Sequence, residues 1–392
     1  MERRFDLDWL RIVLFGLLVL HHVAVGFIDI GVDIYGFAND ERGGPLLNLY
    51  VYFGASWRLP LLFLISGIGT WFATRLAVGL RPLARRVARL MVPALFGTFV
   101  LNATYGYTIA TVTGQSPGSY LAFWASWLLE PEPIQVGHLW FLYNLALYTV
   151  LLWPAHLWWR RMQPKMPPAA VVLTLMAAGV VAIMVAFKPF FWAIAGNGYE
   201  LPWYLWIFAC GYVIGACHQK LLPWLARRVY WLLALALLCF AVEVVMLAVE
   251  FEASADAALA LAQGGWAAQG DVSPFRPGYV LFTTVSGLST WLWCIAFLGL
   301  AARYLNRDHA ALEVLGPAVF PVYVLHFPIT LIGLAWMVEL PWPWLLKFWL
   351  LAALVYGLSL AIYWIVKRLG PVVYLIGGKV PDRRARFPEG PV

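Results

Sequence analysis

Charged residues and cysteines are scarce in this sequence. Charged residues make up 12% of the 392 positions, whereas a soluble domain carries roughly 25%. This shortage excludes an ordinary water-soluble globular protein. The few cysteines all fall within apolar stretches, which argues against a disulfide framework. They are Cys210, Cys217, Cys239 and Cys294.

Motifs for several kinds of site are also missing. The sequence contains no metal-ligating motif, no Walker-type phosphate loop, no dinucleotide-binding fingerprint and no nucleophile elbow. We therefore expect no metal and no tightly bound cofactor. The net charge is +7, but the basic residues alternate with apolar stretches instead of forming one basic domain. This distribution is a topology signal and argues against a nucleic-acid partner.

Long hydrophobic runs are abundant, and the mean hydropathy is +0.77. Many runs reach the ~20 residues that a helix needs to cross the hydrocarbon core of a bilayer. They predict an all-α, polytopic helical membrane protein with about ten transmembrane helices. The expected spans are 8–30, 48–73, 90–112, 137–157, 168–188, 199–217, 229–250, 278–302, 317–338 and 343–366.

The basic residues predict the orientation of these spans. Most of the 27 Lys and Arg residues fall in alternate connections, as the positive-inside rule requires if both termini are cytoplasmic. We expect one helical bundle over 1–376 and a polar cytoplasmic tail over 377–392. The long connections 31–47 and 113–136, together with 251–277, would then face outward and could shape an acceptor site. The first apolar run lacks a small-residue cleavage site, so we expect it to be retained.

The first predicted span carries ionisable side chains. Asp8 and Arg11 are three residues apart, which permits an ion pair near the inner boundary. His22 shares the helix face of Arg11, ~16 Å further along the axis, whereas His21 points about 100° away. An ionisable group inside a span indicates a functional site. The alternative is structural: Arg11 would reach cytoplasmic phosphates and His22 would bond a neighbouring helix.

A basic segment precedes the third span. Arg85, Arg86 and Arg89 are at spacings that bring side chains together on a helix surface. Arginine presents forked donors that suit phosphate oxygens, so this cluster can bind a cytoplasmic donor with several phosphates. An ordinary inner loop that grips anionic membrane lipid remains the alternative.

Further polar residues lie within other spans. With alternating topology, Arg58, His138 and Glu243 fall between the midplane and the outer surface, as His22 does, and His326 lies near the middle of the ninth span. Each taken singly is typical of an interhelical hydrogen bond, but together they favour a lined cavity. In the second span, Ser66 and Gly67 would allow close approach of another helix.

Five short patterns carry a resemblance to a known family. They are Asp8-x-x-Arg11-x10-His22 in the first span, FLISG in the second, RRVARLMVP before the third, HLWFL opening the fourth and YVLH late in the chain. In this order, the sequence resembles the acyltransferase-3 family over nearly its whole length. The DWLR opening and the WRLPLLFLISG segment are most similar to the branch that contains the glucan-succinylating enzymes of bacteria.

The resemblance implies a membrane O-acyltransferase of the bacterial inner membrane. Its donor would be cytoplasmic acyl-CoA carrying an acetyl or succinyl group, and its acceptor a hydroxyl of an extracytoplasmic glycan or related molecule. His22 would be the catalytic histidine and Arg11 its charged companion, although the second histidine, His21, leaves the identity of the catalytic imidazole open.

The remaining roles follow from the same resemblance and from the polar residues above. Arg85, Arg86 and Arg89 would bind the phosphates of the donor. The residues expected to contact substrate are Arg58, His138, Trp140, Glu243 and His326.

Two mechanisms and one rival function stay open. His22 can act as general base on the acceptor hydroxyl or carry the acyl group as a transient acyl-imidazole. The rival is a secondary transporter or proton-coupled exporter, because intramembrane His, Arg and Glu residues also build proton relays. No internal repeat is visible in the sequence, so the transporter gains no direct support.

Overall fold

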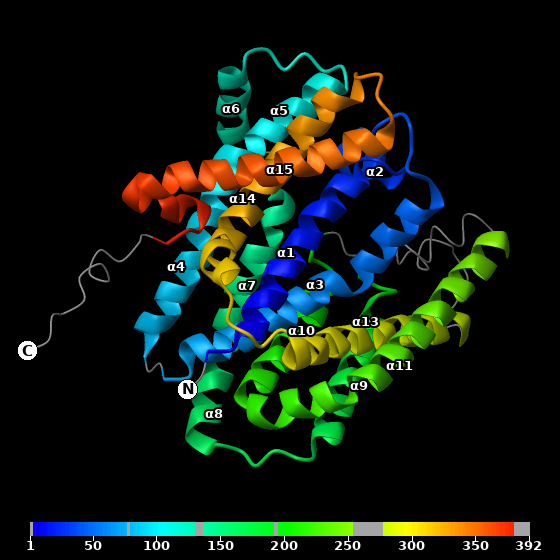
Figure 1. Ribbon diagram of the computed structural model, residues 1–392, viewed down its shortest axis with the longest axis vertical. Helices are drawn as coiled ribbons and strands as arrows, with labels where there is room; N and C mark the ends of the chain where they lie inside the picture. The colour runs from blue at the N-terminus through cyan, green and yellow to red at the C-terminus, as the bar shows by residue number, and fades with distance from the viewer. Residues whose placement is uncertain (1–2, 77–78, 130–135, 192–194, 254–276, 380–392) are drawn as a thin grey trace, which may run out of the picture. The chain divides into compact units, whose positions relative to one another are not determined.

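The computed structural model describes residues 3–76, 79–129, 136–191, 195–253 and 277–379, and every element in these ranges is a helix (Figure 1). Eight stretches of helix there are long and apolar enough to cross a membrane. They are α1 (Phe5–Val25), α3 (Gly44–Thr74), the continuous run of α4 (Leu80–Phe96), η1 (Gly97–Leu101) and α5 (Asn102–Val112), α9 (Ala169–Phe187), α11 (His218–Ala253), α13 (Pro277–Tyr304), α14 (Ala310–Val338) and α15 (Trp344–Arg368). The all-α polytopic membrane class is therefore confirmed.

Two of the ten expected spans correspond to shorter helices. The stretch expected over 137–157 is divided into η2 (Gly137–Leu139), α7 (Trp140–Leu151) and α8 (Trp153–Met162). The span expected over 199–217 is α10 (Glu200–Ala216), which has 17 residues. A count of ten spans and the cytoplasmic placement of both termini stay predictions.

Short helices fill parts of the expected connections. They are α2 (Ile30–Tyr35), α6 (Tyr120–Leu129) and η4 (Gly370–Ile376). Most of the outer connection expected over 251–277, and of the tail expected over 377–392, lies outside the described residues.

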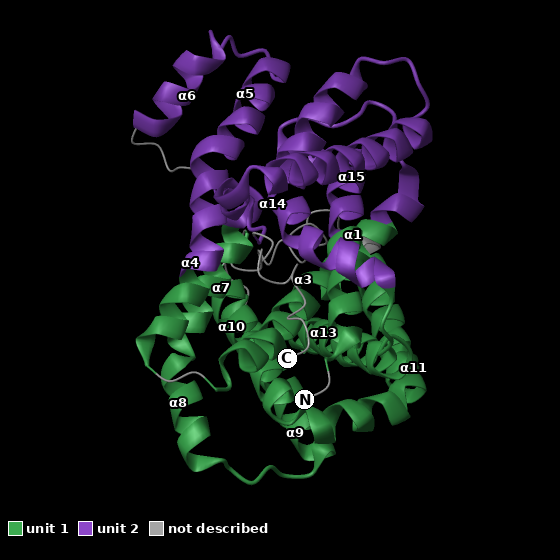
Figure 2. Cartoon of the chain, turned by 60° about the vertical axis from the view of Figure 1, so that its left-hand side comes forward, with its two compact units in different colours: residues 1–17, 49–87, 140–309 green, residues 18–48, 88–139, 310–392 purple. Residues whose placement is uncertain are grey.

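The chain divides into two compact units, each built from discontinuous segments (Figure 2). Unit 1 contains residues 1–17, 49–87 and 140–309, and unit 2 contains residues 18–48, 88–139 and 310–392. Helices α1, α3 and α4 contribute residues to both units. That 1–376 forms a single domain stays a prediction.

In unit 1, α13 packs against both α11 and α9 (Figure 1). Helices α3 and α10 approach each other closely at two glycines. A Cβ atom on Gly67 would lie 2.1 Å from the carbonyl oxygen of Phe208, and one on Gly211 would lie 1.9 Å from that of Leu64. The expectation that Gly67 permits close helix approach is therefore confirmed.

In unit 2, α14 packs against α15 and α5. The loop after α2 is tied to the start of α15 by a buried lysine. The ammonium group of Lys347 donates to the side-chain oxygen of Asn39 at 2.8 Å and to the carbonyl oxygen of Val338 at 3.2 Å. The backbone N–H of Asn39 in turn donates to the carbonyl of Gly26, just past the end of α1.

Substitution of Gly67 by alanine tests the close contact of α3 with α10. Because the opposing atoms belong to the backbone of α10 and cannot rotate away, we expect a loss of roughly 2 kcal/mol or more of stability. Thermal unfolding of the purified protein in detergent should show a clearly lower Tm. The matched control is Gly357→Ala on α15, where no atom lies within 4 Å of the added Cβ, and its Tm should be unchanged or raised. Equal Tm values for the two variants would contradict the contact.

Candidate active site

Three histidines from three separate elements meet in unit 2. They are His22 on α1, His138 in η2 and His326 on α14. The Nδ1 atom of His22 lies 2.8 Å from Nε2 of His326, and the two rings are stacked with centroids 5.0 Å apart. The ring of His138 meets that of His326 edge to face at 5.2 Å. Each of the three was predicted from the sequence as a site residue, and in the structure their side chains lie together.

Phe327 forms an apolar wall for this cluster. Its ring stacks on His138 with centroids 4.9 Å apart and meets the ring of His22 edge to face at 5.1 Å. Tyr35 and Tyr105 pack against other parts of Phe327. The hydroxyl of Tyr35 also donates to the backbone carbonyl of His22 at 2.9 Å, which fixes the end of α1 that carries the imidazole.

Two consecutive backbone carbonyls of α14 accept hydrogen bonds from two of the imidazoles. Nδ1 of His326 lies 2.6 Å from the carbonyl oxygen of Tyr323, and Nε2 of His138 lies 3.2 Å from that of Val324. A carbonyl oxygen only accepts hydrogen bonds, so both of these ring nitrogens are donors. The hydroxyl of Tyr323 donates to the backbone carbonyl of His138 at 2.5 Å, so α14 holds both the ring and the backbone of His138.

Pro328 explains why the carbonyl of Val324 is available. In an α-helix the N–H of residue 328 would donate to the carbonyl of residue 324, but proline has no N–H. Pro328 lies inside α14, so it leaves the Val324 carbonyl open to His138. The proline of the sequence HFP around His326 is the signal for this contact, and the polar residues alone do not reveal it.

Nδ1 of His138 has no hydrogen-bond partner among the described residues. Only 7% of His138 is exposed. Since Nε2 carries the proton of the neutral ring, Nδ1 carries a lone pair. A buried acceptor without a donor costs about 1–3 kcal/mol. This atom is therefore suited to accept a hydrogen bond from a bound molecule.

The two histidines of the doublet differ in their contacts. His22 makes the bond to His326, and the ring of His21 meets that of His22 edge to face at 5.8 Å. Within the described ranges, no group of three or more His, Cys, Asp or Glu residues is arranged to hold a metal ion.

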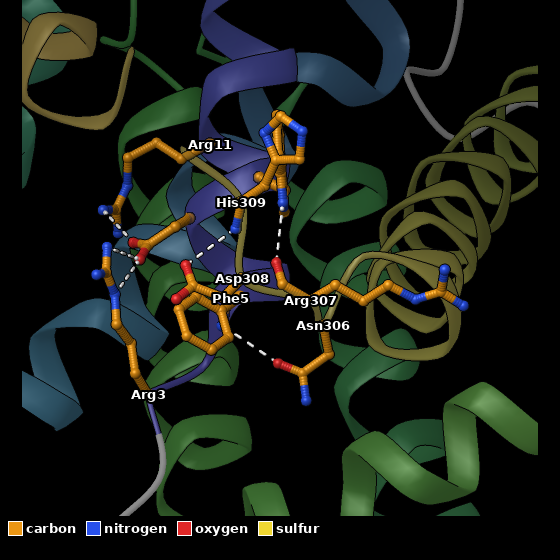
Figure 3. A network of polar contacts seen from close by, with 9 residues as sticks. Arg3, Phe5, Arg11, Asn306, Arg307, Asp308 and His309 are labelled. Atoms are coloured by element: carbon orange, nitrogen blue, oxygen red, sulfur yellow. Dashed lines mark hydrogen bonds and ion pairs between the residues drawn. The ribbon is translucent and has the colours of Figure 1, made fainter. Parts of the chain in front are cut away.

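Arg11 belongs to a polar network in unit 1 (Figure 3). The carboxylate of Asp8 lies between Arg3, at 3.0 Å, and Arg11, at 3.7 Å. The Asp8–Arg11 ion pair expected from the spacing is therefore confirmed. The indole N–H of Trp9 donates to the carbonyl of Arg307, which ties the start of α1 to the loop between α13 and α14.

Glu243 lies in unit 1 and joins three helices. Its Oε1 accepts from the hydroxyl of Tyr52 on α3 at 2.9 Å and from that of Ser286 on α13 at 2.8 Å. Oε2 has no hydrogen-bond partner among the described residues, and the side chain is almost fully buried. Arg58, also buried, lies on α3 of the same unit.

Lys188, directly after α9, interacts electrostatically with Glu243 and with Glu200. Its nitrogen stands over the rings of Tyr199, at 5.8 Å, and Phe282, at 6.0 Å. Lys188 was not predicted as a site residue, because it lies at the end of an expected span, where lysine is ordinary.

Trp140 lies in unit 1, in an aromatic group with Phe63 and Tyr204. Gly196 lies directly against the indole, because a Cβ at this position would be 2.1 Å from the ring. Gly196 also has a φ of +77°, which favours glycine. The indole is thus packed against the protein in this structure.

The three arginines of the basic segment all lie on α4. Arg86 donates to the hydroxyl of Thr70 on α3 at 2.5 Å, within unit 1. Arg85, in unit 1, and Arg89, in unit 2, are exposed. Binding of a single anion by the three guanidinium groups stays a prediction.

A sequence model described as an acyltransferase domain matches residues 4–366. The match covers nearly the whole chain and contains every candidate residue above. No curated protein and no solved structure matches the chain.

Pro328→Ala tests how His138 is held. The new N–H would donate to the Val324 carbonyl and compete with Nε2 of His138. We expect the ¹⁵N signals of His138, in protein labelled at histidine, to change from a single tautomer to an exchanging mixture. Pro317→Ala on the same helix restores an N–H near the exposed start of α14 and should leave these signals unchanged. Unchanged His138 signals in Pro328→Ala would mean that the proline does not control the bond.

Proposed function

Because the chain belongs to the acyltransferase-3 family, we propose that it transfers an acyl group from cytoplasmic acyl-CoA to a hydroxyl of an extracytoplasmic glycan or related acceptor. The observation that carries this proposal is the hydrogen bond between His22 and His326. It holds an imidazole in a defined orientation inside a predicted span, which is what a proton acceptor for hydroxyl acylation needs.

His22 is the proposed catalytic residue. As general base, it takes the proton of the acceptor hydroxyl while the oxygen attacks the thioester carbonyl. The carbon–sulfur bond then breaks, and the proton passes from His22 to the departing CoA thiolate. In the alternative, Nε2 of His22 first takes the acyl group and releases the thiolate. The hydroxyl then attacks the acyl-imidazole, and its proton passes to the vacated Nε2 and on to the thiolate. Both routes use the same ring nitrogen.

His138 is proposed to bind substrate. A hydroxyl of the acceptor would satisfy the lone pair on its Nδ1, which has no other partner among the described residues. We propose further acceptor contacts at Glu243, whose Oε2 is likewise buried without a partner in the described chain, and at Arg58 and Trp140. Arg11 is proposed to offset negative charge that develops during transfer.

Arg85, Arg86 and Arg89 are proposed to bind the donor phosphates. The planar guanidinium group matches phosphate oxygens, and the side chains of Arg85 and Arg89 are exposed, which leaves their donors accessible. The phosphates of anionic membrane lipids would bind to the same guanidinium groups, so kinetics with acyl-CoA have to distinguish donor binding from lipid binding.

We propose that the transferred group is acetyl or succinyl, and that the protein lies in the inner membrane of a bacterium. The proton-coupled transporter loses its support, since the chain belongs to a family of acyltransferases.

His22→Ala should abolish turnover. Loss of a general base costs about 10²–10⁴-fold in rate, and loss of a nucleophile costs more. The measurement is transfer of label from radioactive acetyl- or succinyl-CoA to acceptor by the purified protein. His21→Ala is the matched control and should stay active, and both variants should keep the wild-type Tm. If His22→Ala stays active, the role of His22 is refuted.

Arg85→Ala and Arg86→Ala should weaken donor binding. We expect a severalfold higher KM for acyl-CoA and an unchanged KM for acceptor, because the phosphates lose charge-assisted bonds. Arg81→Ala, an exposed arginine at the start of α4, is the control. Equal changes in both KM values, or the same effect from Arg81→Ala, would favour lipid binding instead.

A further inference from the structure

We propose that the backbone carbonyl of Tyr323 selects, through His326, the tautomer of His22 that carries its lone pair on Nε2. His326 is then a positioning residue, in place of the substrate-contacting role expected from the sequence. This inference rests on the proposed function, because it concerns the state of the ring that takes the proton or acyl group.

The first step is the protonation of His326. Its Nδ1 lies 2.6 Å from the carbonyl oxygen of Tyr323. A carbonyl oxygen has only lone pairs to offer, so an unprotonated Nδ1 at this distance would repel it. The proton of neutral His326 therefore sits on Nδ1, and its Nε2 carries the lone pair.

The second step is the protonation of His22. Its Nδ1 lies 2.8 Å from the Nε2 of His326. Since that nitrogen of neutral His326 can only accept, Nδ1 of His22 must donate. The proton of neutral His22 is therefore on Nδ1, and its lone pair is on Nε2. The tautomer of a histidine is generally set in this way, by the bond that its other nitrogen makes.

The third step is rigidity. The proton position on His326 can set that on His22 only if neither imidazole ring rotates. His326 is completely buried. Its ring is stacked on that of His22 and meets the rings of His138 and Phe327 edge to face. The hydroxyl of Thr330 donates to the backbone carbonyl of His326 at 2.8 Å. Rotation of the imidazole would break both ring bonds within a packed site.

The arrangement also serves the protonated state. When His22 takes a proton on Nε2, its Nδ1–H still donates to His326. In the acyl-imidazole route, acylation at Nε2 lets the Nδ1 proton pass to Nε2 of His326, which leaves a neutral acyl-imidazole on His22. His326 then donates from both nitrogens, to Tyr323 and to His22, and returns the proton when the acyl group leaves. The proton of the attacking hydroxyl passes to the Nε2 atom that the acyl group vacates, and from there to the CoA thiolate, so protons balance in both routes.

The direct test reads the tautomers by ¹⁵N NMR of protein labelled at its seven histidines. The spectrum of His22→Gln identifies the signals of His22. In the wild type we expect a protonated Nδ1 and an unprotonated Nε2 on His22. In His326→Phe, which keeps a ring but removes both nitrogens, this single tautomer should be lost. A wild-type His22 protonated on Nε2, or no change in His326→Phe, would overturn the proposal.

The second test is kinetic. We expect His326→Phe to lower kcat by about 10²-fold, with the KM for acyl-CoA within a factor of three of the wild type. His326→Gln should recover most of this loss, since its amide oxygen can accept from Nδ1 of His22. Thr149→Val on α7, a buried threonine whose hydroxyl likewise donates one turn back, is the matched control for packing and should behave as the wild type. Equal kcat values for the Phe and Gln variants, at matched Tm, would contradict the relay.

The two proposals fail in different ways. If His22→Ala stays active, the proposed role of His22 is wrong. If His22→Ala is inactive but His326→Phe turns over as the wild type does, the role of His22 stands and the relay through His326 is refuted.

Discussion

The histidine cluster depends on two neighbouring carbonyls in one turn of α14. The carbonyls of Tyr323 and Val324 each accept a bond from a different imidazole. Since an acceptor dictates which ring nitrogen bears hydrogen, the backbone of one helix decides the protonation pattern of residues on other elements. Carboxylates often orient histidines in enzymes, but an added negative charge is costly within a membrane span. A backbone carbonyl performs the same task while remaining neutral.

Burial explains why the polar groups of this chain are organised as they are. A polar group without a partner costs about 1–3 kcal/mol when buried, so most are bonded: Glu243 to two hydroxyls, and Lys347 to an amide and a carbonyl. His138 and Glu243 each also carry a buried acceptor atom without a partner among the described residues, as several buried hydroxyls and indoles do. Under the proposed function, each of these two atoms would accept a hydrogen bond from a hydroxyl of a bound molecule.

Local features were predictable from the sequence, and tertiary ones were not. Composition and run length are sufficient to assign the helical membrane class. Spacing predicted the Asp8–Arg11 ion pair, and small side chains predicted the close helix approach at Gly67. The bond between His22 and His326 joins residues 304 positions apart, so it depends on how α1 packs against α14, which no local pattern encodes. The division of the expected span 137–157 into three helices was also missed, because hydropathy does not register where one helix ends and the next begins.

The hydrogen bonds of Lys347 have a consequence for redesign of the loop between α2 and α3. Asn39 receives the ammonium of Lys347 and donates its own backbone N–H to Gly26, four residues after His22. A graft that replaced the loop between α2 and α3 to accommodate a bulkier acceptor would therefore release the end of the helix that carries the imidazole. An engineer should keep Asn39 and Lys347 together as a fixed pair, and vary the exposed residues that flank them.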